Sequence, residues 1–291
     1  MSRSLSALFS LHRLAGNRRL FLFCALLFVV SAFLSFWLFF PAEVLQRRLV
    51  QELAQHSGLG LRGEHAAMRF PPALEFDLYI YPEVQALADL KVDNLRVSPV
   101  WNSLLTDSPA VDLKGGIADG AFTAVVGRKG QLDLNTRHIA LLPLQEAQNT
   151  YRLAGFLQGH FQGEGLTAEM NGQGRFTVEI SEAQVLGLQK IGLPHRLDIG
   201  LLQAEGKFNQ RRVSLEKVVA TEGALELSGG GTLLVGETAE TTRLNLNFRL
   251  HPNQSTPESL RDLIKLSGVR PTADGSYLLR VGGTLAKPVI R

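Results

Sequence analysis

Apolar and polar side chains alternate with a period of two along most of the chain after residue 59. The clearest run is 74–81, LEFDLYIY. Successive side chains of a strand point to opposite faces, so the alternation predicts strands with one apolar and one polar face. Such runs recur about every 8–15 residues, which predicts about fourteen strands and a mainly β fold. Further runs lie at 132–134, 176–180, 213–215, 225–227, 244–250 and 279–281.

Turn signals separate these runs. Asp119-Gly120, Asn171-Gly172 and Asp274-Gly275 are dipeptides that accept the positive φ angles of tight hairpin turns. Consecutive hairpins predict an antiparallel sheet. Helical interruptions are expected at Leu142–Arg152 and at Pro257–Leu266, and a weak seam in the sheet around Gly187–Pro194.

Glycine-rich segments recur inside the predicted strands, at 115–117, 229–233 and 282–285. Glycines within strands usually mark bulges or bends, and a sheet that bends can roll its apolar face inward. We therefore expect residues 59–291 to form one curved antiparallel sheet, shaped as a groove or a partly closed barrel.

The N-terminal part contains 21 residues without a charge, Leu20–Phe40. As a helix this run is about 31 Å long, which matches a hydrocarbon core of roughly 30 Å. A cleaved signal peptide is the alternative, but its apolar region is about 7–15 residues and precedes small residues. This run ends in bulky side chains. We therefore expect a retained transmembrane helix over 20–40, anchored by Leu20, Trp37 and Phe40.

Arginines predict the orientation of this helix. Arg3, Arg13, Arg18 and Arg19 precede it, and only the pair at 47–48 follows closely. The positive-inside rule then places residues 1–19 in the cytoplasm and the rest across the membrane. In a Gram-negative cell, the chain is a single-pass inner-membrane protein with a periplasmic C-terminal domain.

Residues 41–58 predict a short amphipathic helix, because Leu45, Leu49 and Leu53 recur every four residues with Val50 and Ala54 beside them. The helix either lies on the bilayer surface or caps the sheet by burying this stripe. We favour the cap, because apolar residues bury equally well on a sheet edge.

Charge and cysteine content exclude several kinds of partner. After residue 40, the chain carries 26 basic and 27 acidic side chains. Nucleic-acid binding needs a basic face, so no nucleic-acid partner is expected. The single cysteine, Cys24, lies in the apolar run, so the outer domain has no disulfide and no thiolate metal site.

The sequence lacks a nucleophile elbow, a phosphate loop and a His-Glu-x-x-His zinc motif. Glu164, Glu169, Glu179 and Glu182 could supply a carboxylate pair for glycoside hydrolysis. We favour charges on the wet face of a sheet for these acids, and a solvent-facing or core-edge position for His160. We therefore expect no catalytic residues, no metal and no cofactor.

Four segments in order resemble a known family: Phe40–Leu45, Gly58–Gly63, Phe70–Leu74 and Val281–Pro288. They are similar to the AsmA-like proteins, which have an inner-membrane anchor, amphipathic strands and a closing Gly-Thr-Leu-x-x-Pro strand. In length and single outer domain, the chain most resembles the type II secretion system protein N (GspN) branch. The resemblance implies an accessory subunit of the machinery that exports folded periplasmic proteins, with no catalytic residues.

Two functions are therefore expected. The first is a non-catalytic interaction module that binds other inner-membrane subunits of the type II secretion system. The alternative is an AsmA-like protein that binds or transfers lipid in an apolar groove. Its candidate lining residues are Leu225, Leu227, Leu244, Leu246, Phe248 and Leu250, unless these pack against one another or under the helices.

Overall fold

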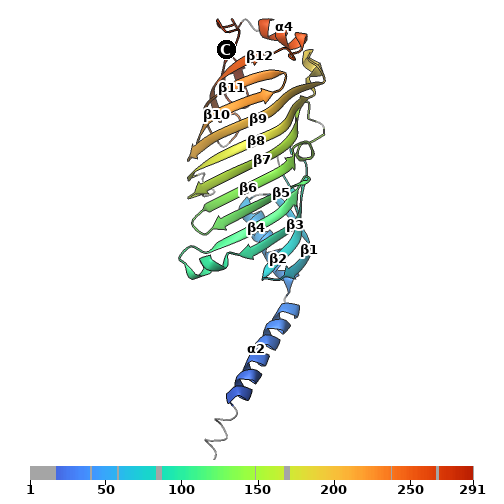
Figure 1. Cartoon of the computed structure of the whole chain (residues 1–291), viewed down its shortest axis with the longest axis vertical. Coiled ribbons are helices and arrows are strands. Elements are labelled where there is room, and N and C mark those ends of the chain that lie inside the picture. The colour runs from blue at the N-terminus through green and yellow to red at the C-terminus, as the bar shows by residue number, and fades with distance from the viewer. Residues whose placement is uncertain are drawn as a thin grey trace, which may run out of the picture.

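The computed structural model describes residues 18–39, 41–57, 59–82, 87–147, 149–166, 171–236, 238–266 and 269–290. Fourteen strands form one antiparallel sheet in which each strand pairs with the next in sequence, from β1 to β14 (Figure 1). The sheet is not closed, because β1 and β14 are its two edges. The predicted β class, strand number and antiparallel pairing are confirmed, and the shape is an open sheet rather than a partly closed barrel.

The strands range from three to fourteen residues. Their bounds are β1 Gly60–Arg69, β2 Ala73–Tyr81, β3 Leu90–Pro99, β4 Ala110–Ile117, β5 Gly120–Gly127, β6 Gln131–Ala140, β7 Arg152–Glu164, β8 Gln173–Leu186, β9 Arg196–Asn209, β10 Arg212–Glu222, β11 Leu225–Leu234, β12 Arg243–Pro252, β13 Tyr277–Gly283 and β14 Pro288–Ile290. The helices are α2 Arg18–Phe39, α3 Ala42–Ser57 and α4 Glu258–Leu266, with 3-10 helices η1 Trp101–Leu105, η2 Leu142–Leu144 and η3 Leu188–Ile191.

Helix α2 lies beyond the β1 end of the sheet (Figure 1) and covers most of the apolar run. Most of the residues predicted to anchor the helix or to flank it in the cytoplasm are not described by the structure. Arg13 and Phe40 are not among the described residues, and neither are the side chains of Leu20, Trp37, Arg18 and Arg19. The described residues alone contain no helix with the length and apolarity that crossing a membrane requires.

Helix α3 caps the first strands, and it does so with only part of the predicted apolar stripe. Val50 is 8% exposed and packs with Leu74, Phe76 and Leu78 of β2. The buried positions of α3 are 46 and 50, with 42, 49 and 54 half-buried. Two of the three stripe leucines, at 45 and 53, remain exposed together with the valine at 44. The helix is therefore rotated by about one residue from the expected stripe.

Helix α4 covers the other end of the same face. Its Leu260 and Ile264 are buried with Leu225 of β11 and Leu250 of β12. The connection before α4 is held to the β10–β11 turn, where Asn253 Nδ2 donates to a backbone carbonyl at 2.8 Å. The predicted helix at 257–266 is thus confirmed.

Two other expectations were wrong. The predicted helix at 142–152 is only the 3-10 helix η2, because the Gln145 side chain closes the loop by bonding the backbone of Leu141 and Leu153. No seam occurs at 187–194, since β8 and β9 pair along their length on either side of η3.

The bulges lie in part where the glycines predict them. The register shifts between Asp93 and Arg96 and between Leu215 and Val218 fall opposite Gly115 and Gly230. Register shifts occur at His65, Asn94 and His138, which are non-glycine residues with positive φ. The pairing of Gly229–Gly231 with β12 is continuous. Glycines in the strands also have a second role, because phenylalanine rings of neighbouring strands lie against them.

Candidate functional site

One line of cross-strand partners crosses the whole sheet, and every member is apolar or glycine. We call it the apolar row. Since directly paired residues share a face, the row defines one apolar face of the sheet. Thirteen strand spacings of about 4.8 Å give it a length of roughly 60 Å. Its members are Met68, Leu74, Val97, Leu113, Ala124, Leu134, Phe161, Phe176, Gly206, Leu215, Gly231, Leu246, Val281 and Ile290.

Phenylalanine rings on this face lie over glycines of the neighbouring strand. A Cβ on Gly206 would be 2.6 Å from Cζ of Phe176, its cross-strand partner. A Cβ on Gly229 would be equally close to Cδ1 of Phe248. The same pairing joins Phe122 to 115 and Phe208 to 174. Glycine therefore leaves the space that lets each ring lie against the sheet.

Helices cover the two ends of the apolar face, and no described helix covers its middle, although Ala124 of the row is buried there. The cluster under α3 and the cluster under α4 contain no described residue between 123 and 184. In that interval Leu134, Phe161 and Phe176 of the apolar row are only half-buried. Phe161 stacks on Phe208 with ring centroids 5.2 Å apart, so the open part has an aromatic floor.

The connections that the structure describes cover one side of the face more than the other. The β2–β3, β6–β7 and β8–β9 connections lie at the same strand ends, and Leu87 of the first pairs with Gln145 of the second. Close to these connections Ile139 and Ile180 are buried. Toward the opposite strand ends the pair formed by 111 and 126, both valines, is exposed. Among the described residues, which leave out 167–170 of the β7–β8 connection, the apolar face is therefore less covered toward the ends joined by the β3–β4 and β5–β6 connections.

The predicted lining residues fall into two groups. Leu225 and Leu250 are buried under α4, and Leu227 packs against the same cluster. Leu244, Leu246 and Phe248 are half-buried on the same face of β12, and the second of these belongs to the apolar row. Whether these residues contact a lipid stays a prediction.

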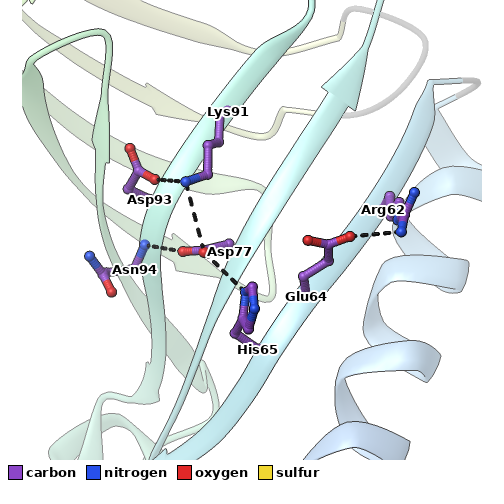
Figure 2. Close-up of polar contacts among 7 residues, drawn as sticks. All are labelled: Arg62, Glu64, His65, Asp77, Lys91, Asp93 and Asn94. Atoms are coloured by element: carbon purple, nitrogen blue, oxygen red, sulfur yellow. Dashed lines mark hydrogen bonds and ion pairs between the residues drawn. The ribbon is translucent and has the colours of Figure 1, made fainter.

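The opposite face carries charged side chains that are paired with one another (Figure 2). Lys91 Nζ lies 2.5 Å from Asp93 Oδ1 and 3.9 Å from Asp77 Oδ2. The hydrogen bond to Asp93 raises the pKa of Lys91 above its ordinary value of 10.5. Asp77 also lies 3.4 Å from His65 Nδ1 and accepts the backbone N–H of Asn94 at 2.9 Å, so it holds two bulges in register.

The carboxylates considered for glycoside hydrolysis are not brought together as a pair. Glu179 accepts hydrogen bonds from Gln158 at 2.5 Å and Gln203 at 2.9 Å, in a polar-face hollow of about 430 Å³. Glu164 pairs across the sheet with Gln173, which lies six residues before Glu179 on β8, so the two carboxylates are far apart along the strands. Glu182 is exposed at a bulge, and 169 lies outside the described residues. Among the side chains that are described, no three histidines, cysteines or acids are grouped as metal ligands.

Hydrogen bonds order the loop that precedes β13. The hydroxyls of Thr272 and Ser276 donate to the Asp274 carboxylate, and these bonds lower the pKa of Asp274. The buried Ser276 fixes this loop beside the end of the apolar face that α4 covers.

Comparisons with protein-family models, with curated proteins and with solved structures found no match. The similarity to AsmA-like proteins therefore stays an expectation from the sequence.

Proposed function

We propose that this chain is a membrane-anchored protein that binds the alkyl part of an amphiphile along its apolar groove. One observation carries the proposal: the apolar row continues through every strand of the sheet, and only Leu74, Ala124 and Gly206 among its members are buried. A core formed only for stability would be covered along its length, because exposed apolar surface is unfavourable in water.

The shape of the groove suits a long, flexible chain. Its floor is made of aliphatic side chains and flat rings, which contact methylene groups without polar partners. Charged side chains lie on the other face, where several are paired with one another, so the apolar row itself is uncharged. An alkyl chain of lipid length, rather than a compact polar metabolite, fits such a surface.

The anchor supports the same function. Leu20–Phe40 has no charge and is long enough to span a bilayer as a helix. With arginines on its N-terminal side, it would hold the sheet on the periplasmic side of an inner membrane. An amphiphile carrier needs this proximity, because its ligand resides in the bilayer.

Photo-cross-linking tests the proposal. The full chain is reconstituted in nanodiscs that contain a phospholipid with a diazirine on its acyl chain, and cross-linked peptides are mapped by mass spectrometry. Labels should gather on peptides of β5–β8, at apolar-row positions such as Leu134 and Phe161. Labelling confined to residues 20–40, with none on the sheet, would reject the groove as a binding site.

A second candidate function is an interaction subunit of the type II secretion system. The C-terminal hairpin favours it, because Leu285, Val289 and Ile290 are exposed beside the free edge of β14. Exposed apolar residues at a sheet edge are typical of partner surfaces. Gentle detergent extraction should then recover other inner-membrane secretion subunits with the chain. Recovery of the chain alone, with normal secretion after its deletion, would refute this candidate.

A further inference from the structure

An exposed apolar cluster lies where the groove opens, at the α2 end of the sheet. We call it the apolar tip and define it as Phe70, Trp101, Leu104 and Leu105. Leu105 is 94% exposed, Phe70 is 76% exposed, and the other two are about half-exposed. Large apolar side chains exposed together mark an interaction surface more often than a free surface.

The register places these residues at one corner of the sheet. Phe70 is in the turn between β1 and β2, and η1 follows β3. Leu74 of β2 pairs with Val97 of β3. The β1–β2 turn, just before Leu74, and η1, just after Val97, therefore lie at the same ends of neighbouring strands. Those ends are the open side of the groove.

The loop satisfies its own backbone while it turns its apolar side chains outward. Ser103 Oγ donates to Val100 O at 2.6 Å and accepts the Ala110 N–H at 2.8 Å. The N–H of Ser103 donates to Val100 O, and that of Thr106 donates to Ser103 O. Segment 100–106 contains no charged residue. These bonds lower the cost of moving the loop into a low-dielectric interface, because the polar groups that make them are already paired.

The short connection between α2 and α3 limits which surface the apolar tip can contact. Only residues 40 and 41 separate α2 from α3, and α3 packs directly on β1 and β2. The strands that carry the tip are therefore held beside the end of α2 (Figure 1). The exposed face of α3, with Val44, Leu45 and the basic pair at 47–48, lies at the same end.

We propose that the apolar tip inserts into the bilayer that holds α2 and brings the open side of the groove against the lipid surface. This inference rests on the proposed anchor and specifies where amphiphiles enter the groove: from the leaflet on the sheet's side, past η1. A tryptophan at the rim suits this position, because indole rings prefer the headgroup region of a membrane.

The two tryptophans of the chain make a direct test possible. Trp37→Phe leaves Trp101 as the sole reporter. The full chain is placed in phosphatidylcholine nanodiscs whose acyl chains carry bromine at either a shallow or a deep position. Trp101 emission should be quenched, more strongly by the shallow bromines, and its maximum should lie to the blue of a water-exposed indole.

Two further variants show whether the tip is responsible. In the same background, replacing Leu104 and Leu105 by serine should abolish most of the quenching. Leu285→Ser, which changes an exposed leucine at the far end of the sheet, should leave quenching unchanged. Circular dichroism checks that each variant keeps its β structure.

The outcomes separate this inference from the proposed function. Unquenched, water-like emission from nanodisc-bound protein would overturn membrane insertion of the tip. Failure of the chain to associate with nanodiscs would overturn the anchor and the inference together. Acyl-chain cross-links in the groove with an unquenched Trp101 would keep the groove as a ligand site and refute its entrance at η1.

Discussion

Replacing Leu134 by aspartate should abolish amphiphile binding while the sheet stays folded. Leu134 is a half-buried member of the apolar row, between Ala124 and Phe161 on the neighbouring strands. It lies in the open part of the groove, away from both covered clusters. A carboxylate at this point would interrupt an alkyl chain that follows the row.

The size of the effect follows from the strand spacing. An alkyl chain that follows the row meets a new strand every 4.8 Å or so, roughly four methylene groups. Burial of each methylene contributes about 0.8 kcal/mol to binding. If the alkyl chain is excluded from one strand, the binding free energy therefore falls by about 3 kcal/mol. This weakens the dissociation constant by more than about a hundredfold. The loss of folding stability is smaller, about 1 kcal/mol, because only part of the leucine is buried.

Native mass spectrometry of the full chain, released from a non-ionic detergent and titrated with phosphatidylglycerol, measures the bound fraction. The matched control is Asn135→Asp, which adds the same charge one residue later on the opposite face. The control should bind like the unmodified chain. If both folded variants bind lipid equally, the reasoning from the apolar row is wrong.

Three other predictions concern stability. Val50→Asp should destabilise the α3 end by more than about 3 kcal/mol, because it buries a charge, whereas Leu53→Asp at an exposed position should have little effect in thermal unfolding. Gly206→Ala should cost about 1–3 kcal/mol, because its Cβ would lie 2.5 Å from the backbone oxygen of Ser214 and 2.6 Å from Cζ of Phe176. Gly116→Ala, whose Cβ would have no neighbour closer than 3.6 Å, should be tolerated; equal melting temperatures would contradict this explanation. The Asp274 carboxylate has a lowered pKa, so its stabilisation is present above the ordinary value of 3.8 and is lost as the pH falls below it. Thermal unfolding of the parent chain should therefore lose stability in acid relative to Asp274→Asn, and parallel pH curves would refute the assignment.

The strands could be predicted because alternation is a local signal that does not depend on register. Leu74, Phe76 and Leu78 share a face in any sheet, and the structure buries all three. The contact between Phe176 and Gly206 could not be predicted, because it needs the register of strands whose residues are thirty positions apart. The only sequence signal for this contact was that phenylalanines occur in one predicted strand and glycines in the next.

Other features depend on packing that the sequence states only weakly. The sequence does not decide which side of the α3 stripe packs on the sheet. The leucines and the side with Val50 are offset by one residue, and the fit to the sheet favours Val50. Bulges at His65 and Asn94 take positive φ without glycine, because Asp77 between them pairs with both. For the candidate groove, the sequence predicted an apolar face; its covered ends and open middle depend on where the connections fold back.

Because every strand pairs with the strand just before it, each new strand finds its partner already present when the chain is delivered N-terminus first. No segment has to wait for a distant one, so the sheet can lengthen hairpin by hairpin as residues emerge from a ribosome or a translocation pore. The same serial order would allow a pair of strands to be gained or lost during evolution, with the remaining pairings kept and only the reach of the molecule from its tether changed.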